Sequence, residues 1–147
     1  MMDAVIERPK GPHYVIDLVP IEYLRQVWPH VDRRIESFVE RSHGRVTLES
    51  TIQRVANREW QLWLVSHGKT VCGCVLTHVY QSDSGMKLCE ILACVGDDAT
   101  QWVHLLNEIE AWAGANGCQR VQAWARKGWA KHLPDYKMTH VLLEKEI

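Results

Sequence analysis

The chain has 147 residues, of which 17 are basic and 18 acidic, and its formal net charge is −1. A chain of this length fits one domain whose core needs no disulfides, so we expect a single domain over 1–147, with a polar arm at 1–12. The near-neutral charge argues against binding to nucleic acid or to anionic membranes. No apolar run approaches the roughly 20 residues of a membrane span, and residues 1–12 lack the apolar core of an export signal. We therefore expect a cytoplasmic protein.

The five cysteines all lie in apolar contexts, at positions 72, 74, 89, 94 and 118. We expect reduced, buried thiols and no bound metal. Cys72 and Cys74 have a C-x-C spacing and could be joined by Cys89 and His78, but the sequence lacks the second cysteine pair that is typical of zinc sites.

The chain has seven tryptophans and one phenylalanine, which is an unusual ratio. Exposed tryptophans favour interfaces, so a protein partner, at these residues or at the N-terminal arm, or a homo-oligomer is expected.

The first part of the chain predicts one strand followed by two helices. The stretch "HYVIDLV" at 13–19 alternates as a strand does. From Ile21 to Phe38 apolar residues recur at steps of three and four, which predicts a helix that Pro29 kinks or splits. Thr47 is then placed to cap a second, shorter helix.

The second part predicts an antiparallel meander followed by alternating helices and strands. The meander is expected at 60–66, 70–80 and 86–95. After it we expect a helix near 99–115, a strand at 118–125, a helical turn at 127–133 and a final strand at 139–147. A right-handed crossover would join 86–95 to 118–125 in parallel. The expected class is therefore α/β (α+β), a mixed, mostly antiparallel sheet with a central parallel strand pair and flanking helices.

This order of elements resembles the GCN5-related N-acetyltransferase (GNAT) fold over nearly the whole chain. More narrowly, the chain is similar to small GNAT-like proteins encoded by tailed bacteriophages, which implies a bacterial host cell or a virion as its location. The stretches behind this resemblance are "LWLV" (62–65), "EIEAWAGANGC" (108–118), "ARKGW" (125–129) and "VLLEKEI" (141–147). The resemblance implies acetyl-CoA as the acyl donor and an amine as the acceptor.

GNAT enzymes carry Gln/Arg-x-x-Gly-x-Gly/Ala between the fourth strand and the following helix, where backbone N–H groups hold the coenzyme A pyrophosphate. The corresponding stretch here is "CVGDDA", with "LACVGDDATQW" around it. By resemblance, the cofactor-binding residues would be Cys94, Val95, Gly96, Ala99 and Thr100.

This turn departs from the GNAT pattern, because it has one early glycine, a cysteine in the first position and two aspartates. Asp97 and Asp98 would repel an anionic ligand. Aspartate is also a favoured helix cap, so the sequence favours capping by these two residues and weak binding of acetyl-CoA.

Two residues are candidates for acid–base catalysis. Glu90 is the lone acid of an apolar strand, on the strand where GNAT enzymes often place an acid, and burial would raise its pKa toward a useful value. The alternative is a structural glutamate at an edge or in a salt bridge. Tyr136 lies near the position of the family's general-acid tyrosine, and the alternative is a tyrosine that only packs.

A third group, Arg126, Lys127 and Trp129, follows a strand at its carboxyl end, where open α/β sheets bind ligands. A guanidinium beside an indole suits an anion or a planar ligand. The alternative is a packed tryptophan beside solvated charges.

Two functions remain open at this point. The first is an acetyl-CoA-dependent N-acyltransferase with a divergent pyrophosphate loop. The second is a non-catalytic GNAT-fold protein that serves as a virion component or binds a host factor.

Overall fold

The centre of the fold is one five-stranded sheet with strand order β1-β2-β3-β4-β5. The computed structural model describes residues 13–147, so the predicted N-terminal arm lies outside the described residues. The strands are β1 (Tyr14–Leu18), β2 (Trp60–His67), β3 (Thr70–Gln81), β4 (Lys87–Gly96) and β5 (Arg120–Ala123). Among these described strands, only the β4–β5 pair is parallel. The expected fold class is confirmed, with one difference: the parallel pair lies at the edge of the sheet and not at its centre.

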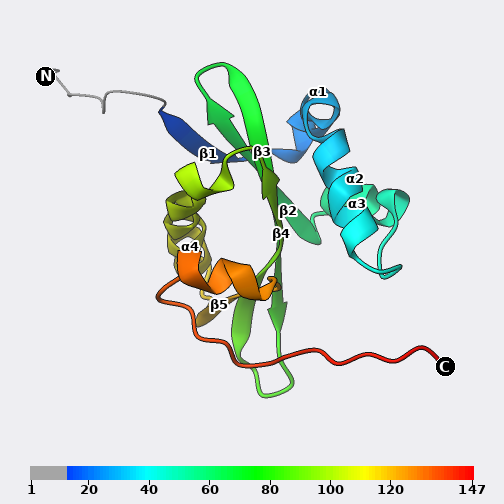
Figure 1. Ribbon diagram of the computed structural model, residues 1–147. Helices are drawn as coiled ribbons and strands as arrows, with labels where there is room; N and C mark the ends of the chain where they lie inside the picture. The colour runs from blue at the N-terminus through cyan, green and yellow to red at the C-terminus, as the bar shows by residue number, and fades with distance from the viewer. Residues whose placement is uncertain (1–12) are drawn as a thin grey trace, which may run out of the picture.

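Helices cover both faces of the sheet, as Figure 1 shows. One face carries η1 (Ile21–Tyr23), α1 (Leu24–Val27), η2 (Trp28–His30), α2 (Asp32–Arg41) and α3 (Leu48–Ala56). The other face carries η3 (Ala99–Gln101), η4 (Val103–Leu105), α4 (Leu106–Ala115) and η5 (Lys127–His132). None of the helices in residues 13–147 has the length and apolar character needed to cross a membrane.

The first helical region follows its sequence signals closely. The run from Ile21 to Arg41 is split at Trp28–His30, a 3₁₀ turn with Pro29 in its first positions, as predicted. Thr47 caps α3: its hydroxyl accepts from the N–H of Ser50 at 2.9 Å, while the Ser50 hydroxyl accepts from the N–H of Thr47 at 3.0 Å. This reciprocal capping satisfies two N–H groups that the helix itself cannot pair.

The helix expected near 99–115 forms in three pieces. It starts as the 3₁₀ turns η3 and η4, and α-helical geometry begins only at Leu106. Trp102 separates the two turns with a φ of −129°, outside the helical range. The physical reason is the position of its side chain, which is fully buried between this segment and the sheet.

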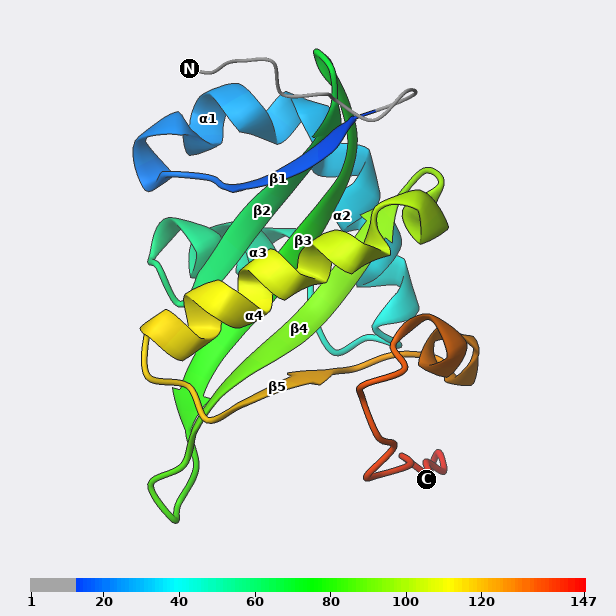
Figure 2. The same ribbon diagram turned by 90° about the vertical axis from the view of Figure 1, so that its left-hand side faces the viewer.

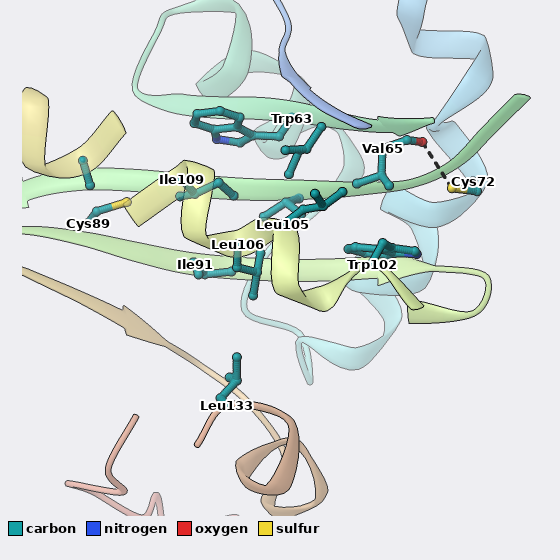
Figure 3. Close-up of a cluster of buried hydrophobic side chains, with 13 residues drawn as sticks. Trp63, Val65, Cys72, Cys89, Ile91, Trp102, Leu105, Leu106, Ile109 and Leu133 are labelled. Atoms are coloured by element: carbon teal, nitrogen blue, oxygen red, sulfur yellow. Dashed lines mark hydrogen bonds between the residues drawn. The ribbon is translucent and has the colours of Figure 1, made fainter. Parts of the chain in front are cut away.

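The core consists of two hydrophobic clusters, one on each face of the sheet. The cluster on the α4 face is drawn in Figure 3, where Trp102 lies against the ends of β3 and β4, close to Val65 and Cys72. Two facing glycines, Gly73 and Gly96, make room for this indole: a Cβ on either one would lie 2.8–2.9 Å from its ring. The cluster on the other face is built around Ile35, Leu62 and Leu76.

The predicted final strand at 139–147 is wrong, because the segment has no regular secondary structure. Its aliphatic side chains are exposed, and Leu143 is 88% exposed. A strand forms only where a neighbour accepts its backbone hydrogen bonds, and the adjacent β5 has only four residues. The segment is instead held by an ion pair between Arg45 and Glu144.

The sheet opens between β4 and β5, and this opening positions the candidate site. Their ladder runs from Leu88↔Arg120 to Ile91↔Ala123 and ends there, while β4 continues to Gly96. Leu92, the next residue of β4, is an extra residue in the β3–β4 register, a bulge that increases local twist. In Figure 2 the two strands diverge beyond this point, with the β4–η3 turn and η5 at the open end.

Candidate active site

The turn after β4 contradicts the expected capping by aspartate. Asp98 stands in the N-cap position of η3, but its backbone is left-handed (φ 51°) and its side chain makes no capping hydrogen bond. The Asp97 carboxylate bonds to Arg34 of α2 at 3.1 Å. Within residues 13–147, nothing accepts from the backbone N–H groups of Asp98, Ala99 and Thr100. The donors that capping would have occupied are therefore available to a ligand.

Asp97 is fixed by three hydrogen bonds, none of which caps a helix. Its N–H donates to Cys72 O at 2.9 Å, and its C=O accepts from Trp102 Nε1 at 2.9 Å. Its carboxylate accepts from Arg34 Nη2 at 3.1 Å. Arg34 belongs to the helical layer on the opposite face from η5, so the Asp97 carboxylate is held toward that layer.

A groove of about 400 Å³ lies between this turn and η5, at the open end of the β4–β5 pair. On one side it is lined by Asp98, Ala99 and Thr100. On the other it is lined by Arg126, Gly128, Trp129, Lys131 and His132. Among the described residues that line the groove there are thus two cations and a histidine, together with one carboxylate, that of Asp98. This lining suits a phosphorylated ligand.

The groove joins two sets of residues that were predicted as separate sites. Ala99 and Thr100, expected to bind cofactor, line it together with Arg126 and Trp129. Lys127 begins η5 and is exposed, but it does not line the groove. Trp129 is half-buried, with its ring edge-on to His132 at a centroid distance of 6.1 Å.

The remaining cofactor-binding candidates, Cys94, Val95 and Gly96, lie along β4 beyond the end of β5. The Asp97 N–H donates to Cys72 O of β3. Because backbone groups alternate in direction along a strand, those of Val95 also point toward β3, and those of Cys94 and Gly96 point to the open side. An open strand edge of this kind pairs with extended chains that carry amide groups. Burial raises the pKa of Cys94 to about 12, so its thiol stays protonated.

Glu90 lies one residue before the β4–β5 ladder ends. Its neighbours Cys89 and Ile91 belong to the core cluster on the α4 face, so by strand alternation Glu90 lies in a polar cluster on the opposite face. His78 Nδ1 is hydrogen-bonded to Oε1 at 3.0 Å, while Gln122 Nε2 and Trp124 Nε1 donate to Oε2 at 3.1 and 2.9 Å. The Glu90 side chain is 14% exposed and the His78 side chain 30%. The His78 ring also stacks on Tyr80, with centroids 5.5 Å apart.

This arrangement pairs a carboxylate with a histidine. Because the carboxylate accepts at Nδ1, it fixes the ring orientation and leaves Nε2 as the nitrogen that can take up a proton. The cluster therefore has the composition of an acid–base pair, with Glu90 orienting His78 or accepting a proton itself.

Tyr136 lies apart from this cluster, packed against the core on the α4 face. Its hydroxyl donates to Glu110 Oε2 of α4 at 2.7 Å. Burial, together with this carboxylate, raises the pKa of Tyr136 well above its ordinary value. Its hydroxyl stays protonated at neutral pH, but the structure does not bring it to Glu90.

Sequence reasoning missed several site residues, notably His78, Gln122 and Trp124 around Glu90, and Arg34, Lys131 and His132 around the turn. A signal for His78 was present. The β3–β4 hairpin with its turn at 82–85 pairs Gln81 with Lys87, which places His78 opposite Glu90. No local signal marks Arg34, because it lies 63 residues from Asp97.

The cysteines lie outside the groove and the acid cluster. All five are free thiols, with Cys72, Cys74 and Cys89 buried. Across the described residues 13–147, no group of three His, Cys, Asp or Glu side chains could hold a metal ion.

The Asp98 geometry predicts an unusual tolerance to glycine. Asp98→Gly should change the free energy of unfolding by less than about 0.5 kcal/mol, because relief of left-handed strain offsets the greater freedom of glycine in the unfolded chain. Asp98→Ala should lose about 1 kcal/mol. Urea denaturation of both variants checks this. An alanine variant as stable as the glycine variant would contradict the left-handed conformation of Asp98.

Comparison with known proteins identifies the fold. No protein-family model and no curated protein sequence matches the chain. Solved structures do match: an aminoglycoside acetyltransferase from an uncultured soil metagenomic sample has a TM-score of 0.67 at 14% identity, covering 91% of this chain and 96% of that one. A predicted acetyltransferase of Clostridium acetobutylicum, solved with acetyl-CoA, has a TM-score of 0.62 at 8% identity, covering 91% and 96%.

Glucosamine-6-phosphate N-acetyltransferase from Arabidopsis thaliana is a third similar structure, with a TM-score of 0.61 at 10% identity, covering 91% of this chain and 98% of that one. These structures are GNAT acetyltransferases, so the chain has the GNAT fold. At these identities the likeness shows the fold, and the activity has to be argued from the site.

Proposed function

We propose that the protein is an acetyl-CoA-dependent N-acetyltransferase. The observation that carries the proposal is the basic groove at the open end of β4 and β5. Arg126, Lys131 and His132 line it together with three residues whose backbone N–H groups have no acceptor within residues 13–147. The groove fits the phosphates of acetyl-CoA, and the open edge of β4 fits the amide groups of its extended arm. When bound, acetyl-CoA would supply an acetyl thioester.

The residues around Glu90 would handle the proton of the acceptor. Acetyl transfer would join the amine nitrogen to the acetyl carbonyl carbon and release the sulfur as thiolate, so the amine would have to give up a proton. Glu90, or His78 held by Glu90, takes the proton that the nitrogen releases. Tyr136 was expected to protonate the thiolate, and that role requires the Tyr136–Glu110 hydrogen bond to break.

The acceptor proposed for a first screen is an amino sugar. Two of the similar structures are named as acetyltransferases of an aminoglycoside and of glucosamine 6-phosphate. Glu90 provides an anionic point for a protonated amine, and the exposed ring of Trp124 beside it provides a flat surface for a sugar.

The groove predicts a defined response to charge removal. Isothermal titration with acetyl-CoA should show binding to the native protein, and Arg126→Ala/Lys131→Ala should weaken it about tenfold or more through loss of two phosphate contacts. Arg120→Ala is the matched control, because this exposed arginine begins β5 at the opposite end of the β4–β5 ladder. Equal weakening in the control, or no binding to the native protein, would contradict the proposal.

A second candidate function is a non-catalytic GNAT-fold protein that binds a host factor or belongs to a virion. Exposed aliphatic side chains favour it, since Val141, Leu142 and Leu143 are 66–88% exposed. An apolar groove of about 520 Å³ between α1 and α3 adds a second surface of this kind. The titration separates the two candidates, because only the enzyme requires the basic groove to bind acetyl-CoA.

A further inference from the structure

The two aspartates of the turn differ in where their carboxylates lie. Asp98 lines the phosphate groove, whereas Asp97 does not. The Asp97 backbone is fixed at both ends, by Cys72 O and by Trp102 Nε1, so its side chain can change only by rotation about its own bonds. Its carboxylate is 77% exposed, and Arg34 of α2 is its side-chain partner in the described structure. Packing therefore does not hold this carboxylate in place, and the ion pair does.

We propose that Arg34 is a positioning residue for the phosphate groove, which holds the Asp97 carboxylate toward α2 and neutralises its charge. This inference rests on the proposed acetyl-CoA function. Arg34 is suited to the task because its side chain is only 23% exposed and its second nitrogen, Nη1, bonds to His30 O at 3.4 Å. The guanidinium is thus also anchored to η2, the 3₁₀ turn that precedes α2.

The ion pair explains how a turn with two acids can serve an anionic ligand. A free carboxylate next to Asp98 would add a second negative charge beside the groove and could accept from the N–H groups that a phosphate needs. With Arg34 in place, Asp98 supplies the only carboxylate that lines the groove within residues 13–147, beside two cations and a histidine. The groove therefore keeps a net positive lining.

The test is a double-mutant cycle read by titration with acetyl-CoA. Arg34→Gln should weaken binding about fivefold or more, because the Asp97 carboxylate loses its partner and its negative charge then repels a nearby phosphate. Asp97→Asn should bind at least as tightly as the native protein. The double variant should return to within about twofold of native affinity, because the charge that Arg34 controls is gone. Arg34→Lys should retain part of the affinity, since it keeps the charge but not the second anchor.

The matched control is Arg33→Gln, which removes the same charge from the neighbouring position of α2, where the exposed side chain has no bonding partner in residues 13–147. It should leave affinity unchanged, and thermal unfolding should show every variant folded at the titration temperature. If the double variant is as weak as Arg34→Gln, Arg34 contacts the ligand directly and the positioning role is wrong. If Arg34→Gln binds like the native protein, the inference fails while the proposed function survives. If the native protein binds no acetyl-CoA, both fail.

Discussion

Trp102→Ala is expected to lower the free energy of unfolding by about 3–5 kcal/mol, the range for truncation of a buried tryptophan to alanine. The indole is fully buried, and the facing glycines Gly73 and Gly96 leave a space that only this ring fills. Its Nε1 also donates to Asp97 O, so truncation leaves that carbonyl without its donor. Equilibrium denaturation in urea measures the loss.

Two variants make this result specific. Trp102→Phe should lose less, because it keeps much of the ring volume and gives up the hydrogen bond. Leu143→Ala removes a large apolar side chain that is 88% exposed, and should change the free energy of unfolding by less than about 0.5 kcal/mol. If Trp102→Ala cost no more than Leu143→Ala, the close packing of the turn against β3 and β4 would be contradicted.

Most elements could be predicted because their signals are local. Pro29 splits a helix wherever it falls inside one, and Thr47 with Ser50 is a capping pair readable over four residues. The meander from 60 to 96 was likewise set by its turns and its apolar runs. The stretch at 139–147 has strand-like composition but no strand, because a strand also needs a neighbour, and local residues carry no information about the short outer edge of β5.

The site was harder to predict, for a related reason. Aspartates before a helix favour capping on local grounds, and that interpretation of Asp97 was wrong because Arg34, 63 residues away, competes for the carboxylate. The groove also joins the turn to η5, which approaches it only because β5 returns parallel to β4 and stops at Ala123. The charge around the turn thus depends on contacts between segments that are far apart in the sequence. Residue patterns within one segment do not predict such contacts.

The Glu90 cluster depends on the register of the sheet. Glu90 lies opposite His78 on β3 and Gln122 on β5 because both neighbouring strands are in fixed register with β4. Its two oxygens accept from three donors, so its position is well determined before any substrate arrives. The acid or base proposed here must lie within hydrogen-bond reach of the proton it moves, and a carboxylate fixed in this way needs no rearrangement to hold its position.

Glu90→Gln is therefore expected to lower kcat about 10²- to 10⁴-fold with an amine acceptor, the usual contribution of a positioned acid or base. Release of free thiol from acetyl-CoA measures the rate. Affinity for acetyl-CoA should stay within about twofold of native, because the phosphate groove is formed by other residues, at the open end of the strands. His78→Gln should also lower kcat, and the double variant should lose little more than either single one, since paired catalytic groups act as a unit.

Glu108→Gln supplies the matched control, because it makes the same change at an exposed position of α4. It should leave kcat and affinity unchanged. Thermal unfolding should show that Glu90→Gln remains folded, since the glutamine occupies the same space and can still accept from Trp124. If Glu90→Gln kept more than half of the native kcat while acetyl-CoA still bound, the cluster would be structural, and the proton would have to leave by another route. If instead His78→Gln retained native kcat and Glu90→Gln did not, Glu90 itself would be the base. A carboxylate that accepts the proton directly does not need the imidazole, so loss of the imidazole would leave the rate unchanged.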